Sequence, residues 1–552
     1  MRLRATVVLP LVLVLAACGK SAPAPAPDAA APPPTETQAP PTSAPPEAAA
    51  DAAPSESPED AGAATTAAAD EDAAATAAAN EDATAAAPKG DAMLWAGAVT
   101  APGGMELGIE VALAKNADGA WSGTISIPMQ NVKDHVLDGV AADDHALAFT
   151  LKLPGMPEAA WAKFTATLAE DGKTAAGTLH QGGLDLPLKL ERTTAEALAA
   201  SAPKRPQMPA PPFPYTVREV SFKHPTTGAT LAGTITAPAD DAKHAAAVLI
   251  TGSGLQDRDE TIFGHKPFLV LADWLTRHGV VVLRVDDRGV GGSTGDAESA
   301  TVLDNATDVE AAFRFLREQP EVDPAKVGLI GHSEGGIIAP VVASRVPEVA
   351  FVVALAGTGM TGEELIPLQY ALMAKAEGVA DTAVAATLAL EKAAIAAAAK
   401  GEPRDVVKTA VKALVAAQSP EIAGVSKEEL ESDAFLERAV DQLLGVWFLS
   451  FLRLDPKAYW KQVKCPVLAV GGSLDMQVPA EENLALIAAA VKEGGNEDVT
   501  TMTLPSLNHL FQTATTGGLS EYATIEETFA PTALELLSTW IAGKTGGAAP
   551  EK

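Results

Sequence analysis

Cysteine is nearly absent from this chain. Only Cys18 and Cys465 occur among the 552 residues, and Cys18 closes a segment with the features of an export signal. Without Cys18 the chain retains one thiol, which excludes an intrachain disulfide and a zinc site built from cysteines. Seven of the nine histidines, all but His332 and His509, show no metal-ligand spacing with one another or with Cys465. We therefore expect no metal.

Basic and aromatic side chains are also scarce. The chain has 40 Lys and Arg against 71 Asp and Glu, a formal net charge of −31, and 5% aromatic residues. This charge argues against nucleic acid as a partner. Two glycine clusters, at residues 252–254 and 289–295, fit neither the dinucleotide-binding pattern nor a phosphate loop that ends in Gly-Lys-Ser/Thr. We expect no cofactor.

The N-terminus has the pattern of an export signal over residues 1–18. Arg2 and Arg4 precede an apolar run, residues 7–15, that is too short to span a bilayer. Residues 15–19, Leu-Ala-Ala-Cys-Gly, resemble the lipobox of bacterial lipoproteins. The resemblance implies lipid attachment at Cys18 and, with Gly19 next, an outer-membrane anchor that faces the periplasm. The alternative is an ordinary signal peptide with an incidental cysteine.

Residues 19–90 consist almost entirely of Ala, Pro, Ser, Thr, Asp and Glu. A segment with so few large apolar residues cannot bury enough surface to offset the entropy lost on ordering. We expect a disordered tether, with cell-wall binding as the alternative.

Residues 91–193 indicate a small antiparallel β domain, a barrel or a sandwich. Alternating apolar runs, separated by Asp-Gly turns, lie at residues 107–113, 119–127, 146–153, 163–168 and 175–179. The segment resembles the lipocalin-like modules that precede some exported hydrolases. Its tryptophans, Trp95, Trp121 and Trp161, are expected in the core rather than in a ligand site. A proline-rich linker, residues 194–214, follows.

Residues 215–546 alternate strands with helices, which is typical of a doubly wound α/β domain. Runs at 217–223 and 230–237 predict an opening hairpin. The later short runs, rich in β-branched residues, predict a parallel sheet covered on both faces; they lie at 245–250, 280–285, 327–330, 349–355, 467–470 and 499–504. Residues 361–460 instead predict long Ala-rich helices, such as 380–400 and 405–417. We interpret this insertion as a lid, with a structural helical bundle as the alternative.

A candidate nucleophile lies in the string Gly-His-Ser-Glu-Gly-Gly at residues 331–336. It follows an apolar strand and precedes a helix, so the string predicts a sharp turn with Ser333 at its tip. Such a turn leaves no room for side chains at Gly331 and Gly335. We interpret the adjacent His332 as a packing residue, because it points away from the nucleophile in a turn of this kind.

Two further motifs precede this string in the order typical of one superfamily. They are Thr-Gly-Ser-Gly-Leu-Gln-Asp-Arg-Asp-Glu at residues 251–260 and Arg-Val-Asp-Asp-Arg-Gly-Val-Gly-Gly-Ser at 284–293. Together the three motifs resemble the α/β-hydrolase superfamily, and most closely bacterial carboxylesterases of the EstD type. In that family the catalytic acid and histidine follow later strands, and Asp475 and His509 match those positions.

The chemistry of the residues leads to the same three side chains. A serine hydroxyl needs a base near neutral pH, and a carboxylate must orient that base. His509 alone among the histidines lies on a loop just beyond a sheet strand at the edge where Ser333 emerges. The backbone N–H groups of Ser253 and Glu334 are the candidate oxyanion donors.

Charged residues on the same rim have a structural interpretation. Asp257, Arg258 and Asp259 are expected to order their loop, with substrate contact as the alternative. We expect Asp286 and Arg288 to pair with each other and to fix the end of their strand.

The sequence therefore predicts a lipid-anchored serine carboxylesterase that acts on a small-molecule ester through a covalent acyl-enzyme. A serine peptidase or aminopeptidase on short peptides is the alternative, because the same triad serves both reactions. A large neutral pocket without an acidic cluster for an α-amine would favour the ester. An alternative of another class is an envelope binding protein with a vestigial hydrolase domain. Protein partners are not predicted.

Overall fold

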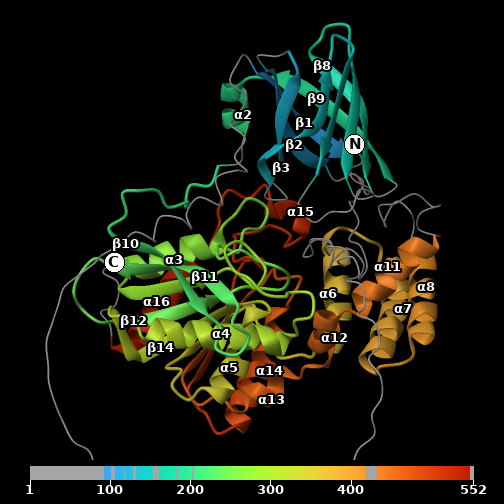
Figure 1. Ribbon diagram of the computed structural model, residues 1–552. Coiled ribbons are helices and arrows are strands. Elements are labelled where there is room, and N and C mark those ends of the chain that lie inside the picture. The colour runs from blue at the N-terminus through green and yellow to red at the C-terminus, as the bar shows by residue number, and fades with distance from the viewer. Residues whose placement is uncertain are drawn as a thin grey trace, which may run out of the picture.

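The computed structural model describes residues 92–100, 106–116, 119–127, 132–152, 161–181, 184–201, 204–417 and 432–546. The predicted signal peptide and tether, residues 1–90, lie outside the described residues. Two sheets organise the rest: a nine-stranded sheet and an eight-stranded sheet. The first forms a separate lobe above the second, and the helical insertion lies beside the second (Figure 1).

The N-terminal sheet is a nearly closed antiparallel barrel. Its spatial order is β4-β3-β2-β1-β9-β8-β7-β6-β5. The two edge strands are consecutive in the chain and meet at Leu137, whose N–H donates to the Gly123 carbonyl at 2.9 Å. The strands are β1 (Met93–Thr100), β2 (Glu106–Lys115), β3 (Trp121–Ile127), β4 (Val132–Val136), β5 (Asp138–Ala142), β6 (Ala146–Leu151), β7 (Ala162–Leu168), β8 (Thr174–Gln181) and β9 (Leu184–Thr193).

The prediction of a small β domain is confirmed, and its form is the barrel rather than the sandwich. The alternation pattern missed β1, β4, β5 and β9, because β4 and β5 are short and polar and β9 contains a proline. Trp95 is fully buried and Trp121 packs against the same core. Trp161 is only half-buried, and the Lys152 ammonium lies 4.3 Å from its ring centroid.

The second sheet has the order β10-β11-β13-β12-β14-β15-β16-β17. Only β11 runs against its neighbours; all pairs from β13 to β17 are parallel. The strands are β10 (Tyr215–Lys223), β11 (Thr230–Pro238), β12 (His244–Ile250), β13 (Val280–Val285), β14 (Val322–His332), β15 (Val352–Leu355), β16 (Val467–Gly472) and β17 (Val499–Leu504). The opening hairpin and the parallel sheet are therefore confirmed.

Helices cover both faces of this sheet, as the apolar strands require. One buried cluster joins the sheet to α3 (Pro267–Arg277) and α16 (Pro531–Thr545). The opposite cluster contains α4 (Val302–Arg317), α5 (Gly335–Arg345) and α14 (Ala480–Glu493). Helix α4 begins at Val302, where Thr301 and Asp304 form a reciprocal capping box.

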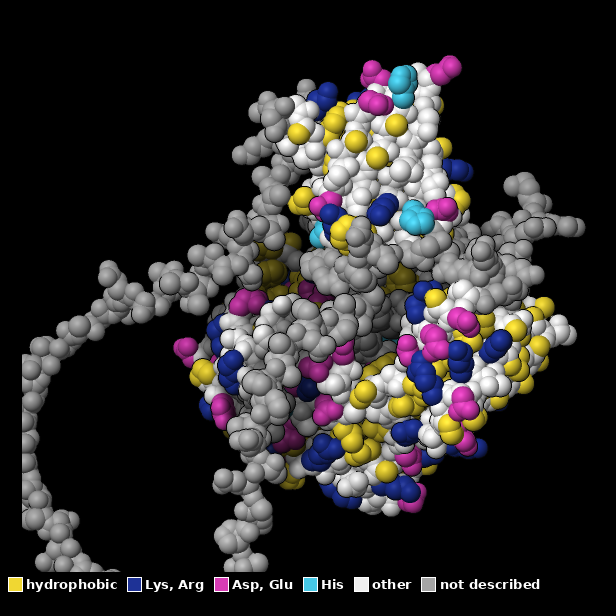
Figure 2. Space-filling view, turned by 45° about the vertical axis from the view of Figure 1, so that its right-hand side comes forward, with side chains coloured by type: hydrophobic (Ala, Val, Ile, Leu, Met, Phe, Trp, Pro, Cys, Tyr) yellow, Lys and Arg dark blue, Asp and Glu magenta, His cyan; other side chains and the backbone are white. Residues whose placement is uncertain are grey.

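The predicted helical insertion lies between β15 and β16, and we call it the lid. Its described helices are α6 (Gly362–Ala376), α7 (Asp381–Ala399), α8 (Arg404–Ala416), α11 (Asp433–Leu443), α12 (Val446–Arg453) and α13 (Pro456–Trp460). Helix α7 is long and apolar enough to cross a membrane, but it packs between α6 and α8. Acidic and basic side chains are interspersed on the outer surface (Figure 2), where Arg404 and Lys408 both pair with Glu437.

The linker between the sheets contains the short helix α2 (Ala195–Ser201) and then contacts the α/β domain. The Arg205 guanidinium donates to backbone carbonyls of Phe263, Gly264, Ala523 and Ile525. The Gln207 side chain donates to the Phe529 carbonyl and accepts from the Thr528 and Phe529 amides. The linker therefore binds the segment that follows His509, which the proline content alone did not predict.

Candidate active site

The turn after β14 has the geometry of a nucleophile elbow. Ser333 has φ +54°, in the left-handed region that non-glycine residues rarely adopt. A Cβ on Gly331 would lie 2.0 Å from the Gly335 carbonyl oxygen, and one on Gly335 would lie 2.2 Å from the Ile250 carbonyl oxygen. Both glycines are thus required by close backbone approach, as the sharp turn predicted from the string requires.

Asp475 and His509 lie together beside this turn. The His509 Nδ1 is 2.8 Å from Asp475 Oδ2, and both residues are 4% exposed. Asp475 follows β16, and its Oδ1 accepts the backbone N–H groups of Gln477 and Val478, each at 2.8 Å. These two amides fix the carboxylate, so its second oxygen holds the imidazole in the tautomer that leaves Nε2 free to act as a base.

The loop that carries His509 is ordered by its own side chains. Asn508 Oδ1 accepts from the Leu510 and Gln512 amides, and Asn508 Nδ2 donates to Gln512 Oε1 at 2.9 Å. His265 lies behind this loop, hydrogen-bonded to Thr528 Oγ1. Burial, helped by the nearby Arg205 charge, lowers the pKa of His265 to about 4, so it is neutral at physiological pH.

The Ser333 hydroxyl forms no hydrogen bond to any residue that the structure describes. The Ser333 amide donates to the Leu355 carbonyl at 2.8 Å, which fixes the backbone of the elbow. The ring of the preceding His332 is 4.8 Å from that of His509, centroid to centroid, so the elbow and the base loop are in contact. Hydrogen bonds between a nucleophile and its base are often long in unliganded enzymes and tighten when substrate binds.

Of the candidate oxyanion donors, the structure leaves two amides available. Gly252 N–H donates to Glu260 Oε1 at 2.8 Å, so it cannot serve. Across the described ranges the Ser253 and Glu334 amides donate to no protein acceptor. Ser253 lies in the turn after β12, and Glu334 follows the nucleophile directly.

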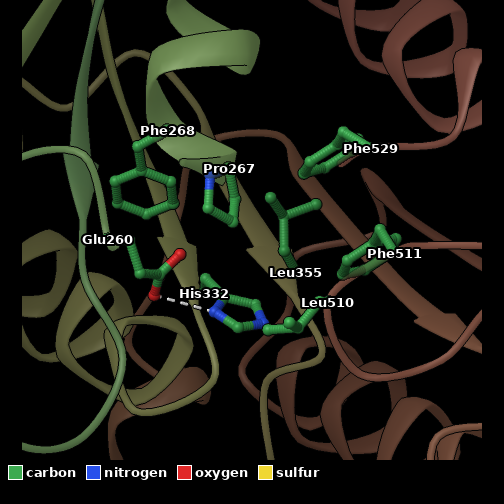
Figure 3. A pocket seen from close by; sticks show the side chains of 8 residues that line it. All are labelled: Glu260, Pro267, Phe268, His332, Leu355, Leu510, Phe511 and Phe529. Atoms are coloured by element: carbon green, nitrogen blue, oxygen red, sulfur yellow. Dashed lines mark hydrogen bonds and ion pairs between the residues drawn. The ribbon is translucent and has the colours of Figure 1, made fainter. Parts of the chain in front are cut away.

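His332 is not simply a packing residue. Its Nδ1 is 2.8 Å from Glu260 Oε1, and its Nε2 is 2.9 Å from the His509 carbonyl oxygen. Figure 3 shows the Glu260 contact among Phe268, Leu355 and other apolar side chains. The sequence did not predict this role, although His332 and Glu260 both lie inside the motifs that we identified.

The predicted pair between Asp286 and Arg288 is wrong. Asp286 instead binds Arg258, with Oδ2 2.7 Å from Nη2, and Arg288 binds Asp308, with Nε to Oδ2 at 2.6 Å. The two side chains of the predicted pair leave the loop in different directions. The expectation that residues 257–259 order their own loop is confirmed by this Arg258 contact and by the ion pairs that Asp259 forms with Lys266 and Arg284.

We call residues 251–260, the loop after β12, the oxyanion loop. A cavity of about 610 Å³ lies between the oxyanion loop, α4 and the lid. Its wall includes Gly252 and Gly254 from the loop after β12, Glu334 from the elbow, and Trp447 and Phe448 from α12. The Trp447 indole donates to the Glu334 carboxylate at 2.9 and 3.1 Å. The lid therefore contacts the residue beside the nucleophile, and α12 contributes both to the cavity wall and to the core.

The cavity wall is acidic, which the sequence did not predict. Asp286 and Asp308 are each paired with an arginine, but in the described part of the chain Asp287 and Glu334 have no cationic partner. Burial raises the pKa of Asp287 to about 8 and that of Glu334 to about 7. Both carboxyl groups therefore take up and release protons near neutral pH. Among the residues that the structure describes, no group of three His, Cys, Asp or Glu could hold a metal ion.

The strand order, with one antiparallel strand near the edge and an elbow after the fifth strand, defines an α/β-hydrolase, and the chain is a hydrolase. The family described as X-Pro dipeptidyl-peptidase (S15 family) matches residues 227–510, just over half of the chain, and the chain belongs to this family. It is also similar to esterase EstD from Thermotoga maritima, at 25% identity over 280 residues. The similar region is 51% of this chain and 58% of that esterase's length.

Two of the solved structures that the chain matches are an esterase and a protein solved with a bound acid. The Pyrococcus furiosus esterase Pf2001 is 14% identical, with 63% of this chain and 99% of that chain covered and a TM-score of 0.37. Est1E from Butyrivibrio proteoclasticus, solved with ferulic acid, is 16% identical, with 59% and 96% covered and a TM-score of 0.34.

Proposed function

We propose that the chain is a serine carboxylesterase that cleaves small carboxylic esters through a covalent acyl-enzyme. The observation that carries the proposal is the hydrogen bond between buried Asp475 and His509, beside an elbow that holds Ser333 at φ +54°. A carboxylate, an imidazole and a serine in this chain order are what acyl transfer requires. The similarity to esterase EstD supports the ester as the substrate class.

The reaction follows from the positions of these groups. His509 Nε2 accepts the Ser333 proton while Oγ attacks the ester carbonyl, and Asp475 stabilises the imidazolium that forms. The Ser253 and Glu334 amides donate to the oxyanion of the tetrahedral intermediate. The imidazolium then protonates the leaving alcohol. Water, activated by the same base, attacks the acyl-enzyme and releases the acid.

A paired substrate series tests the reaction class. The full chain is assayed with nitrophenyl esters of increasing acyl length and with peptide nitroanilides, and the Ser333→Ala variant serves as the inactive control. We expect ester turnover at every short acyl length and little anilide turnover. Anilide cleavage faster than ester cleavage would contradict the esterase and favour the peptidase.

A second candidate, a serine peptidase that recognises an amine, is favoured by the acidic cavity. Asp287 and Glu334 line the space next to the oxyanion loop, and Trp447 adds an aromatic face that attracts cations. Membership of the S15 family agrees with this candidate. A neutral cavity without an acidic cluster would favour a simple ester, and this cavity contains such a cluster.

The amine site has a definite pH dependence. Below pH 7 Asp287 and Glu334 are mostly protonated and neutral, and they become anionic as the pH rises through about 7 and 8. An ester with a quaternary ammonium group keeps its own charge throughout. We expect its KM to fall about tenfold between pH 6 and 8.5, equivalent to one unit of pKa shift, while the KM of its tert-butyl isostere stays constant. The amine site would be excluded if KM depended on pH in the same way for both esters. It would also be excluded if the pH dependence of KM for the quaternary ammonium ester were as steep in Asp287→Asn as in the wild type.

We also propose that the enzyme is anchored to the outer membrane, facing the periplasm, through lipid on Cys18. The support is the lipobox-like sequence at residues 15–19, followed by a long Ala/Pro-rich segment. In a bacterial host, we expect Cys18→Ala to move the protein from the membrane fraction to the soluble fraction. Membrane association unchanged by this substitution would contradict the anchor.

A further inference from the structure

His332 connects three loops of the site through one buried ring. It precedes the nucleophile, its Nδ1 reaches Glu260 at the end of the oxyanion loop, and its Nε2 reaches the backbone of His509. His332 is 6% exposed and Glu260 is 3% exposed. The contacts are 72 and 177 residues apart in the sequence, so they form only in the complete fold.

The hydrogen-bond partners of the His332 ring indicate which of its nitrogens carry protons. The His509 carbonyl oxygen can only accept a hydrogen bond, so Nε2 must carry a proton. Glu260 Oε1 already accepts the Gly252 N–H at 2.8 Å, so this oxygen acts as an acceptor. A second proton on Nδ1 then completes the contact, and a neutral imidazole has only one proton. The geometry is that of an imidazolium paired with a carboxylate.

The surroundings preserve this pair. Its neighbours Pro267, Phe268, Leu355, Leu510, Phe511 and Phe529 are apolar and exclude water (Figure 3). The other titratable groups that face the ring are His509 and, further away, Asp475. Burial opposes the charge on His332, but the Glu260 carboxylate outweighs it and raises the pKa of His332.

The oxyanion loop packs directly against the pair. A Cβ on Gly252 would lie 3.2 Å from Glu260 Oε1, 3.4 Å from Ser333 Cβ and 3.6 Å from His332 Nδ1. A side chain at position 252 would therefore press against Glu260 and the elbow. A displacement of Glu260 therefore moves the turn that presents the Ser253 amide.

We propose that His332 is a positioning residue, held as an imidazolium by Glu260, that fixes the His509 backbone and the oxyanion loop in place relative to Ser333. This inference rests on the proposed reaction, since it concerns the geometry of that reaction's base and donors. His332 itself does not touch the substrate.

Glu260→Gln separates the two halves of the pair without a change of size. Glu260 Oε1 receives both contacts in the wild type, but the glutamine is neutral and no longer favours a second proton on the ring. The ring then keeps only its Nε2 proton and Nδ1 becomes an acceptor, so the glutamine must present its NH₂ to Nδ1 or its oxygen to Gly252 N–H, and one contact is lost. We expect kcat to fall about 10²-fold, the size of effect that a displacement near 1 Å produces, with KM unchanged within about twofold. Fluorophosphonate labelling of Ser333 should slow in parallel. An unchanged kcat in the folded variant would overturn the proposal.

A matched control separates positioning from lost stability. Leu537 lies buried in α16, a helix that contributes no group to the proposed reaction. Leu537→Ala should lower the thermal midpoint by at least as much as Glu260→Gln while kcat stays near that of the wild type. A parallel loss of kcat in both variants would assign the effect to stability and contradict the proposal.

A spectroscopic measurement on the wild type does not depend on the variants or on any substrate. The chain is labelled with ¹⁵N-histidine, and the His332 signals are assigned by their loss in His332→Gln. We expect both ring nitrogens of His332 to be protonated from pH 6 to 8. One unprotonated nitrogen at pH 7 would overturn the ion pair. If both ring nitrogens are protonated but the esterase assay fails, the proposed function is contradicted and the ion pair is not.

Discussion

Ester turnover is expected to be lost almost completely when Ser333 is replaced by alanine. The Ser333 hydroxyl is the side chain that forms the covalent bond to the acyl carbon in the proposed reaction, so its loss should lower kcat by on the order of 10⁶-fold. KM should change little, because the cavity and the donor amides remain. Initial rates with a nitrophenyl ester, corrected for the spontaneous hydrolysis of the substrate, measure the effect.

The backbone at this position makes the Ser333→Ala test informative. Ser333 holds a left-handed conformation within a turn fixed by Gly331, Gly335 and the Leu355 carbonyl, and alanine fits the same space. The thermal midpoint should therefore stay close to that of the wild type. Residual turnover above about 1% of the wild-type rate would require another nucleophile and would contradict the assignment.

The second large effect is expected for Asp475→Asn, with kcat lower by about 10⁴-fold. The asparagine keeps the shape of the side chain, and its oxygen can still accept from the Gln477 and Val478 amides. Its amide nitrogen then faces His509 Nδ1 and donates to it. This contact favours the tautomer with the proton on Nε2, which cannot accept the proton of Ser333.

Asp498→Asn is the matched control for Asp475→Asn. Asp498 is a half-exposed carboxylate that pairs with Lys544 and directly precedes β17, at the opposite end of that strand from the loop that carries His509. Its substitution should leave kcat and KM unchanged. An Asp475→Asn variant with kcat within tenfold of the wild type would show that His509 is oriented by another group.

The parts of the site that could be predicted from the sequence are those with local causes. The elbow depends on two glycines within two residues of Ser333, so a short string indicates it. Asp475 and His509 lie just beyond strands whose apolar runs are visible in the sequence, and parallel strands bring such positions to one edge. The barrel was predicted for the same reason, because β2, β3, β6, β7 and β8 alternate clearly.

The parts that the sequence did not predict depend on contacts between distant segments. Glu260 meets His332 across 72 residues, and Trp447 meets Glu334 across 113. Neither pair produces a local sequence pattern, because the spacing of residues around each side chain does not indicate its distant partner. The Asp286 and Arg288 prediction failed for a related reason: sequence neighbours were paired, whereas Asp286 and Arg288 each bind a partner on another segment.

The central claim is a covalent acyl-enzyme on Ser333, and intact-protein mass spectrometry tests it most directly. The full chain is mixed with a nitrophenyl ester, quenched in acid within the first turnover, and digested to locate the added mass. The account predicts one acyl group per chain, on the peptide that contains Ser333, and none in Ser333→Ala. Rapid turnover without an acylated peptide, or an acyl group that persists in Ser333→Ala, would contradict it.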